Sequence, residues 1–385
     1  MLKYLPKADS ARPANIIRGK LLTAMTTDQN PSLSPSVEPV PGTAFDAQQF
    51  RATPSVDAYG PQALFEPLSS VQIASGSVAP LTDLALICVT GNDAVSFLHN
   101  QLTNDVEHLD EQQARWFGYC SPKGRLMATF LGWREGPDAI SLLISTPQAE
   151  PIRKRLSMFV LRAKAKVQDA SASRMLFGLT GEQAFAALKA LGIDPPAAMV
   201  HASNDDCHCV GLPSANVDGS ECPRWLLSVP RDRAVQIWEA LCARLAKAST
   251  SDWRWTEVLA GIPRIVPATS EQFVPQMLNF ELVDGVNFKK GCYPGQEIVA
   301  RTQYRGTLKR RMFLGHLDGA VPEPGSDVQA QDAGEPCGKV VLAARSPLGG
   351  VDLLFEAQIS AVQEQPLSIG QAVIELKSLP YCVAL

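Results

Sequence analysis

The longest apolar runs of this chain are only long enough to form β-strands. Residues 84–89 and 140–144 are two of these runs, and both fall far below the roughly 20 residues that a membrane helix requires. Hydrophobic residues make up 45% of the chain and charged residues 19%, which is typical of a globular protein. Because 385 residues exceed what one hydrophobic core usually organises, we expect two or three sheet-containing domains and no transmembrane segment.

The N-terminal part of the chain differs in composition from the rest. Between residues 26 and 66 it is rich in Ser, Thr, Gln and Asp and contains six prolines: Pro31, Pro35, Pro39, Pro41, Pro54 and Pro61. Such a segment buries little apolar surface, so we expect residues 1–65 to be a disordered extension. The first 25 residues are basic and lack the apolar core of a secretory signal. We therefore expect a cytoplasmic protein, with a mitochondrial matrix protein as the alternative. The basic start could be a mitochondrial transit peptide, or an upstream extension before an internal start at Met25.

Strand and helix patterns alternate from residue 84 to residue 245. Residues 84–89 predict a buried strand, and the apolar spacing after Asp93 predicts a helix. Residues 113–133 predict a hairpin with its turn at 121–124. Further strands are expected at 140–144, 163–167, 176–179 and 225–229, and further amphipathic helices at about 152–160, after Gly181 and at 235–245. This order favours an α+β fold of the split β-α-β type.

The pattern changes after residue 310. Short strands are predicted at 312–314, 339–343, 351–355 and 372–376, with Gly, Pro and Asp turns between them and no helical spacing. We therefore expect a small C-terminal β-barrel.

The segment Lys290-Gly291-Cys292-Tyr293-Pro294-Gly295-Gln296-Glu297 carries the most information about function. Its two glycines and its proline are typical of a loop with an unusual backbone path. Such a loop brings a thiol, a phenol, an amide and a carboxylate close together, as binding loops do.

Basic side chains gather around this segment in a chain whose net charge is −4. Between residues 289 and 311 there is one acidic residue, Glu297, and there are seven basic ones: Lys289, Lys290, Arg301, Arg305, Lys309, Arg310 and Arg311. This strip can bind a small molecule that carries carboxylates, or a nucleic-acid backbone. A solvated strand face is the alternative interpretation.

Cys292 is the candidate reactive group. The neighbouring cations favour its thiolate, which is the form that attacks electrophiles or binds metals. A passive buried thiol is the alternative. Sequence spacing supplies no histidine partner, because His99 and His108 are distant in the chain and His316 lies on a later strand. The nine cysteines have irregular spacings, which do not indicate a disulfide framework.

The pattern K-G-C-Y-x-G-Q-E-x-x-A-R at residues 290–301 resembles the signature of the YgfZ family. These are folate-binding proteins related to the aminomethyltransferase of glycine cleavage. The similarity covers roughly residues 80–385 and includes two further blocks. The block just before the signature contains Gly261-Ile262-Pro263, residues 273–276, Asn279 and residues 285–289. The block nearer the N-terminus contains Gly91, Asp93, Phe97, Leu98, Gln101, Leu102, Asp105 and residues 123–125.

The resemblance implies a fold and a function. It implies a three-domain ring of split β-α-β domains with a C-terminal β-barrel, around a folate-sized channel that has the Cys292 loop near its mouth. The expected parts are a folate-binding domain (residues 66–135 plus 250–305), a ferredoxin-like domain (136–249) and the barrel (306–385). The implied cofactor is tetrahydrofolate, and the implied clients are iron-sulfur proteins, including enzymes that thiolate tRNA. A tRNA contact is placed along residues 289–311.

The resemblance also assigns roles to residues. Cys292 becomes the candidate thiolate, and the residues expected to bind folate or to assist the thiol are Lys290, Tyr293, Gln296, Glu297, Arg301, Gln276 and Asn279. No resident metal is expected.

Two departures argue against glycine-cleavage activity. Aminomethyltransferases usually carry an acidic pair shortly after the hairpin glycine, whereas here Gly124 is followed by Arg-Leu-Met-Ala-Thr. They also commonly place Glu two residues before the glycine of a G-x-P motif; here that position is Leu259, and the nearest carboxylate is Glu257. General acid or base chemistry needs a proton acceptor within reach. A folate-dependent one-carbon transferase and a tRNA-binding module nevertheless remain alternatives to the accessory-protein interpretation.

Three other groupings favour ordinary structural roles. The first grouping contains residue types that bind metals, but their spacing fits no standard zinc site, and we expect a surface loop there. Its members are His201, Asp205, Asp206, Cys207, His208, Cys209 and Cys222. The basic residues between Arg153 and Lys166 are more typical of a solvated face than of an RNA track. Trp253 and Trp255 could stack on a pterin, but we favour core positions for them.

Overall fold

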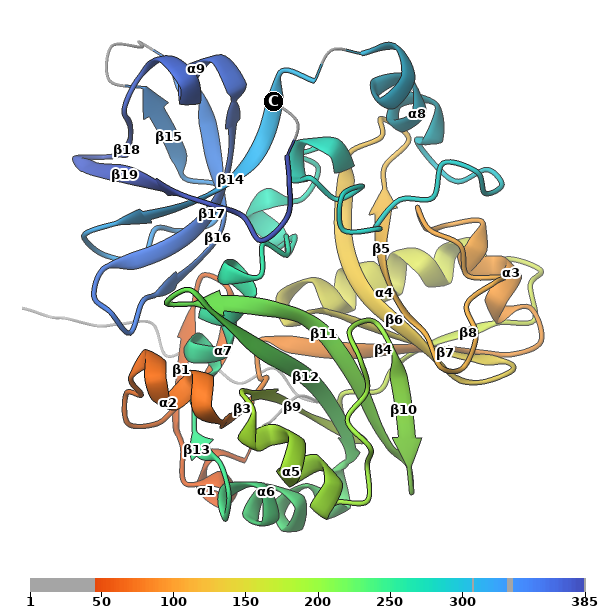
Figure 1. The fold of residues 1–385 in the computed structure, drawn as a ribbon. Coiled ribbons are helices and arrows are strands. Elements are labelled where there is room, and N and C mark those ends of the chain that lie inside the picture. The colour runs from red at the N-terminus through yellow and green to blue at the C-terminus, as the bar shows by residue number, and fades with distance from the viewer. Residues whose placement is uncertain (1–45, 307, 331–334, 384–385) are drawn as a thin grey trace, which may run out of the picture. The chain divides into compact units, whose positions relative to one another are not determined.

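A computed structural model describes residues 46–306, 308–330 and 335–383. These residues form two large sheets, a closed β-barrel and a two-stranded ribbon, with helices between them (Figure 1). None of the helices in the described ranges has the length and apolar character needed to span a membrane. The predicted mixture of helix and strand and the predicted C-terminal barrel are both confirmed.

The first large sheet has five strands in the order β5-β6-β7-β4-β8. All neighbouring strands are antiparallel. Its strands are β4 (Leu84–Thr90), β5 (Ala114–Cys120), β6 (Leu126–Gly136), β7 (Ala139–Ser145) and β8 (Lys166–Asp169), and its helices are α3 (Ala94–His99) and α4 (Thr146–Val160). The predicted hairpin at 113–133 is β5 and β6.

The second large sheet has six strands in the order β10-β11-β12-β9-β3-β13. Its strands are β3 (Ser77–Pro80), β9 (Arg174–Thr180), β10 (His201–Asn204), β11 (Cys207–Val217), β12 (Ser220–Pro230) and β13 (Ala246–Lys247); its helices are α2 (Ser70–Ser75), α5 (Gln183–Ala190) and α6 (Ala234–Cys242). The expectation of a surface loop at residues 201–222 is wrong, because this polar stretch forms strands and buries all three of its thiols. In the described part of the chain, no group of three or more His, Cys, Asp or Glu side chains could hold a metal ion.

The two sheets pack on each other through alternate strand residues. Leu86, Leu131 and Trp133 of the first sheet share a buried cluster with Leu212 and Leu226 of the second. The opposite faces, where strand side chains alternate outward, are covered by helices: α3 and α4 cover the first sheet, and α5 and α6 cover the second. Both cores therefore follow from the two-residue period of the strands and the apolar faces of the helices.

The C-terminal barrel closes in the order β14-β17-β16-β15-β18-β19. Its elements are β14 (Arg310–Leu317), β15 (Asp327–Ala330), β16 (Gly338–Arg345), β17 (Val351–Gln358), α9 (Ile359–Glu364), β18 (Leu367–Ile369) and β19 (Ala372–Lys377). Helix α9 lies in a region where no helix is expected from the sequence. The barrel is joined to α7 (Thr250–Leu259) by Trp255, whose Nε1 donates to Oδ2 of Asp352 at 2.7 Å. Trp253 and Trp255 are both buried, which confirms the core interpretation.

The expected N-terminal disorder does not extend to residue 65. Residues 46–65 form α1 (Ala47–Phe50), β1 (Thr53–Asp57) and β2 (Gly60–Leu64), whereas residues 1–45 lie outside the described ranges. Composition misses this order because a few side chains hold the ribbon. Asp57 pairs with the buried Arg254, and the hydroxyl of the buried Tyr59 donates to the carbonyl of Pro322 at 3.2 Å.

The expected domain limits remain predictions, although the sheets do not follow all of them. The limit at residue 136 separates β5 and β6 from β7 and β8, which belong to the same sheet. Strand β3 precedes the first sheet in sequence but pairs with β9 and β13 of the second. Strand pairing between segments that are distant in sequence therefore crosses the expected boundary between the first two parts.

A buried ion cluster lies where β4 begins, at the centre of these connections. Oδ2 of Asp83 accepts from Nη2 of Arg254 at 3.0 Å and from Nη2 of Arg264 at 2.8 Å. Arg254 also lies over the ring of Tyr59, 4.5 Å from its centroid. Burial alone would raise the pKa of Asp83, but Arg264 and Arg254 hold that pKa below its usual value.

We predict that Asp83→Asn destabilises the fold by about 3–5 kcal/mol, because it leaves two buried arginines without their shared carboxylate. Since the folded-state pKa of Asp83 is depressed, its contribution is fully present above the unfolded-state pKa and is lost as pH falls through the folded-state value. Urea unfolding at pH 7 measures the change. The matched control is Asp138→Asn at an exposed carboxylate, and equal unfolding midpoints for the two variants would contradict the prediction.

Candidate functional site

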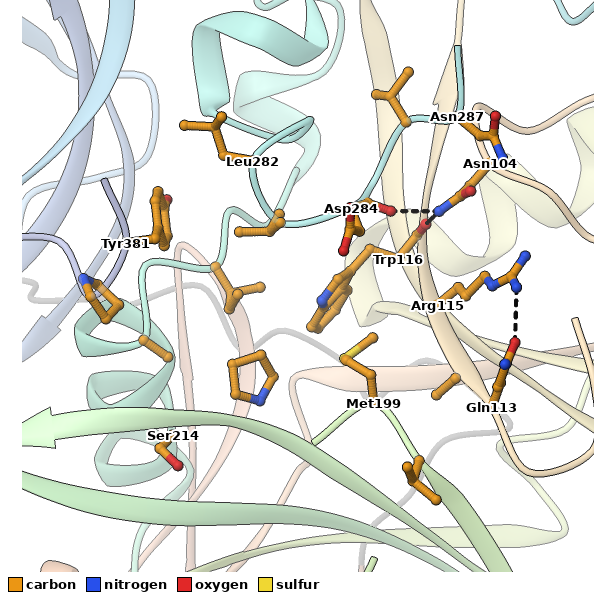
Figure 2. A pocket seen from close by; sticks show the side chains of 18 of the residues that line it. Asn104, Gln113, Arg115, Trp116, Met199, Ser214, Leu282, Asp284, Asn287 and Tyr381 are labelled. Atoms are coloured by element: carbon orange, nitrogen blue, oxygen red, sulfur yellow. Dashed lines mark hydrogen bonds between the residues drawn. The ribbon is translucent and has the colours of Figure 1, made fainter. Parts of the chain in front are cut away.

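A cavity of about 1310 Å³ opens between the first sheet, the β10–β12 region and the segment that leads to the Cys292 loop. Figure 2 shows its wall. The residues that line it include Asn104, Asp105, His108, Arg115, Trp116, Met199, Ser214, Glu221, Leu282, Asp284, Asn287, Phe288, Lys289, Tyr304 and Tyr381. Ligand pockets of 300–1,000 Å³ hold drug-sized molecules, so this cavity has room for a ligand of at least that size.

Hydrogen bonds fix the polar part of the wall. Nδ2 of Asn104 donates to the carbonyl of Trp116 at 3.0 Å and to the carbonyl of Asp284 at 2.5 Å. Nη2 of Arg115 donates to Oε1 of Gln113 at 2.8 Å, and its Nη1 donates to the carbonyl of Asp105 at 2.9 Å. The cavity wall is therefore shaped before any ligand arrives.

The wall combines flat aromatic rings with carboxylates and cations. Trp116, Tyr304 and Tyr381 supply rings, while Asp284 has a left-handed backbone (φ 58°) and an exposed side chain. Lys289, also exposed, supplies a positive charge at the edge nearest the Cys292 loop. Stacking surfaces beside a few placed polar groups suit a planar heteroaromatic ligand with a charged tail.

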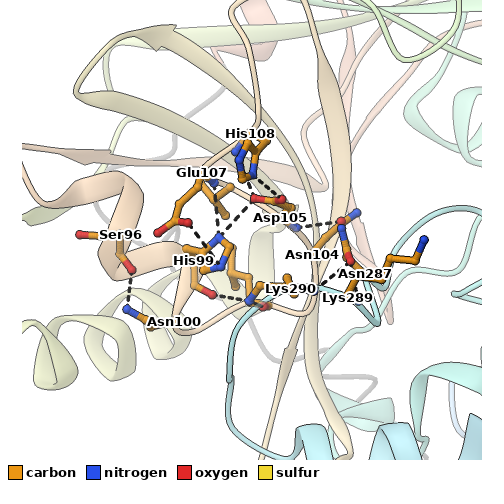
Figure 3. Close-up of polar contacts among 12 residues, drawn as sticks. Ser96, His99, Asn100, Asn104, Asp105, Glu107, His108, Asn287, Lys289 and Lys290 are labelled. Atoms are coloured by element: carbon orange, nitrogen blue, oxygen red, sulfur yellow. Dashed lines mark hydrogen bonds and ion pairs between the residues drawn. The ribbon is translucent and has the colours of Figure 1, made fainter.

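The Cys292 loop begins where this wall ends. Nζ of Lys290 donates to the carbonyl of His99, the last residue of α3, and to that of Leu102, just after α3, at 2.9 Å (Figure 3). Burial lowers the pKa of Lys290 to about 8, while Asp105, Glu107 and Cys292 act in the opposite direction. Cys292 itself is exposed, and Tyr293 is buried, with a pKa raised by that burial.

Two glycines far apart in sequence position the loop. Gly295, at φ 80°, lies against the hairpin turn so closely that an added Cβ would lie 2.4 Å from the carbonyl oxygen of Ser121 and 2.7 Å from Cα of Gly124. Gly124 itself has φ 70°. This contact gives a physical reason why both the 123–125 turn and the 290–297 loop require glycine.

The end of the predicted loop is helical. Helix α8 (Gln296–Arg305) starts at Gln296, so the expectation of a loop through Glu297 is wrong for its last two residues. Gln296 lies near the loop backbone, with Nε2 3.4 Å from the carbonyl of Lys290. Glu297 and Arg301 are exposed on α8.

Gln276 and Asn279 are fully buried in contacts between elements. Nε2 of Gln276 donates to the carbonyl of Val299 at 2.8 Å, and Nδ2 of Asn279 donates to the carbonyl of Met312 at 2.8 Å. They connect the short helix η3 (Pro275–Leu278) to α8 and β14. None of the eight residues expected at the site lines the cavity; their roles toward folate or the thiol remain predictions.

Part of the basic strip is used inside the protein. Arg310 pairs with Glu356, and Arg311 pairs with Glu281. Lys290 is held by backbone carbonyls. Four cations of the strip remain exposed: Lys289, Arg301, Arg305 and Lys309. The interpretation of the strip as one strand face is wrong, because Arg301 and Arg305 lie on α8.

The structure also brings a histidine to the loop. A Cβ added to Gly291 would lie 3.6 Å from Nε2 of His99, so this ring is next to the loop although nearly 200 residues separate the two in sequence. Sequence spacing gives no sign of the contact between His99 and the loop. It also gives no sign of most of the cavity wall, including Arg115, Trp116 and Asp284, because these residues lie outside the Cys292 segment and belong to no motif.

We predict that Gly295→Ala destabilises the fold more than Gly219→Ala does. Both glycines have φ near 80°, so both variants pay the same left-handed strain of about 1–2 kcal/mol. Nothing lies within 4 Å of a Cβ on Gly219, whereas Gly295 meets backbone atoms and should lose about 1–3 kcal/mol more. Urea unfolding of both variants tests this, and equal losses would show that the close contact with Gly124 is unimportant.

Comparisons with known proteins agree with the resemblance in the sequence. The chain is 33% identical over 248 residues to the tRNA-modifying protein YgfZ of Vibrio vulnificus strain YJ016, a match covering 64% of this chain and 71% of the relative. It is 31% identical over 271 residues to the protein of the same name from Enterobacter sp. strain 638, covering 69% and 81%. A scan against protein-family models gave no match.

A solved structure shows the same fold. The glycine cleavage system aminomethyltransferase T from Bartonella henselae superposes with a TM-score of 0.71 at 17% identity, covering 86% of this chain and 95% of that chain. At this identity the likeness concerns the fold alone, and it confirms the fold expected from the sequence. The identities to the curated relatives, over more than two thirds of their lengths, decide the family: the chain belongs to the YgfZ family.

Proposed function

We propose that this chain is a cytoplasmic folate-binding accessory protein for the assembly or repair of iron-sulfur enzymes, including enzymes that thiolate tRNA. Tetrahydrofolate occupies the large cavity, and Cys292 acts beside it as a reactive thiol. The observation that carries the proposal is the position of the cavity. Its wall ends at Lys289, and the Cys292 loop starts at the next residue. The names of the relatives add the connection to tRNA modification.

The composition of the wall supports a folate. A pterin is a flat ring with donors and acceptors on its edge, which suits the rings of Trp116 and Tyr381 and the carboxylate of Asp284. The glutamate tail is anionic and suits the exposed Lys289. Three hydrogen bonds to protein oxygens hold the Arg115 guanidinium, so in this arrangement it positions the wall.

Exposure distinguishes Cys292 from most other thiols of the chain. Burial raises the pKa of Cys120 and Cys242 to about 12, which makes them inert at neutral pH. Among the nine cysteines only Cys292 and Cys382 are exposed. Of these two, Cys292 lies in the electrostatic range of Lys290.

A folate-dependent one-carbon transferase is the alternative enzyme. Glu257, the carboxylate nearest the usual acidic position, is buried against Arg264 at 3.4 Å and does not line the cavity. The cavity does contain Asp105, Glu221 and Asp284, so turnover of a one-carbon donor with tetrahydrofolate is the assay that separates the two functions.

A tRNA contact is supported by the exposed face of α8. Arg301 and Arg305 project there beside Tyr304, whose side chain is 70% exposed and whose ring meets that of Phe288 at 6.0 Å. Exposed cations with an aromatic ring are typical of single-stranded RNA contacts. Binding of tRNA that weakens steeply with salt and is unaffected by Cys292→Ser would favour this role.

We predict that tetrahydrofolate binds the protein and that Lys289→Ala weakens binding roughly two- to fivefold, the range expected for one ion pair at an exposed position. Anaerobic calorimetry measures both affinities. Lys309→Ala, at an exposed cation outside the cavity wall, is the matched control. Absence of binding at millimolar folate would remove the cofactor from the proposal.

We predict that Cys292→Ser abolishes support of [4Fe-4S] enzymes in cells while leaving the melting temperature and folate affinity nearly unchanged. The exposed side chain contributes little packing, and a serine hydroxyl is hardly ionised at neutral pH. Activity of [4Fe-4S] enzymes in a deletion strain is the measurement, with Cys382→Ser as the control at the other exposed thiol. Full complementation by Cys292→Ser would return this cysteine to a passive role.

A further inference from the structure

One carboxylate connects the wall of the cavity to the Cys292 loop. Asp105 lines the cavity, where its Oδ2 lies 2.8 Å from Nδ1 of His108, a side chain that is 80% exposed (Figure 3). Its other oxygen, Oδ1, lies 3.3 Å from Nδ1 of His99, which is buried. Asp105 is thus shared between a histidine that a ligand can touch and a histidine that it cannot reach directly.

The second histidine contacts the loop. Nε2 of His99 faces Gly291 and lies 3.9 Å from Oε2 of Glu107. The carbonyl of His99 accepts from Nζ of Lys290, the residue that precedes Gly291. The contacts therefore run from His108 through Asp105 and His99 to the backbone and the ammonium group on which the Cys292 loop rests.

We propose that Asp105 is a positioning residue that sets the reactivity of Cys292 and transmits to it the occupancy of the cavity. The inference deepens the proposed function and rests on it, because it takes Cys292 as the reactive thiol. It also explains how a cysteine that does not line the cavity can respond to a ligand bound there.

The charges around the loop predict the direction in which Asp105 changes the reactivity of Cys292. Burial and Lys290 lower the pKa of His99, whereas Glu107 and Asp105 act in the opposite direction. Burial lowers the pKa of Lys290, whereas Asp105, Glu107 and Cys292 act in the opposite direction. At pH 6 Lys290 is protonated, because its pKa is about 8. Asp105 therefore offsets part of the positive charge that Lys290 presents to Cys292, and His108 lies against Oδ2 of the same carboxylate.

The ligand-free test is a double-mutant cycle read by the rate at which iodoacetamide alkylates Cys292 at pH 6, with Cys382 changed to Ser in every protein. Asp105→Asn should speed alkylation by about threefold or more, because one negative charge close to the Lys290 ammonium is removed. His108→Gln should slow alkylation about twofold or more in the parent protein and should have no effect in the Asp105→Asn protein. Asp138→Asn is the charge-matched control and should change nothing.

These opposite signs distinguish the inference from a loss of structure. A loop that is merely loosened would be alkylated faster in both single variants, and that result would overturn the inference. Equal effects of His108→Gln in the presence and absence of Asp105 would overturn it as well. Melting temperatures of all variants verify that they are folded.

A second arm adds the ligand. Saturating tetrahydrofolate should change the alkylation rate of the parent protein by about fivefold or more, a typical coupling between two sites, and by less than twofold in Asp105→Asn. Calorimetry on the same samples shows whether folate is bound. If no folate binds, the proposed cofactor fails while the ligand-free cycle still decides the role of Asp105; if folate binds and Asp105→Asn keeps the full change, the role of Asp105 is refuted.

Discussion

The arrangement of this molecule depends on one buried carboxylate, that of Asp83. It sits at the start of β4, where the chain passes from the second sheet to the first, and it receives hydrogen bonds from Arg254 and Arg264. Through Arg254 the cluster reaches Asp57 of the N-terminal ribbon, and α7 carries the link onward to the barrel through Trp255. Breaking a buried ion pair leaves an uncompensated charge, so these elements are held in one relative placement. The cavity wall takes residues from both large sheets and therefore depends on that placement.

Close glycine contacts hold the Cys292 loop in one position. Gly295 can lie against the turn at Gly124 only without a side chain, and Lys290 fastens the other end of the loop to the carbonyls at the end of α3. The loop is therefore anchored on both sides of an exposed cysteine. A reactive group on an anchored loop keeps its orientation, which favours a chemical role over a passive one.

Sequence reasoning predicted the elements that depend on local pattern and missed those that depend on distant partners. The strand at 84–89, the hairpin at 113–133 and the barrel follow from apolar periodicity and turn residues, and all three are present. The order of residues 46–65 depends on Arg254, about 200 residues away, which composition cannot reveal. Helix α8 was missed because Pro294 and two glycines marked its start as a loop.

The candidate site divides in the same way. The K-G-C-Y-x-G-Q-E motif located the loop, yet Gln276 and Asn279, which accompany it in sequence, are buried ties to Val299 and Met312. Trp116 and Asp284 belong to no motif and meet only when the sheet and the 282–289 segment come together. His99 reaches Gly291 in the same manner. Spatial neighbours of this kind have no signature at fixed spacing, so only the fold identifies them.

Folate binding in the cavity is tested most directly by a crystal structure of the protein grown with tetrahydrofolate under anaerobic conditions. We expect electron density for the pterin in the cavity between Trp116, Asp284 and Tyr381, with the glutamate tail toward Lys289 and the Cys292 loop in place beside it. An empty cavity at a folate concentration that saturates binding in solution, or folate bound elsewhere on the molecule, would contradict it.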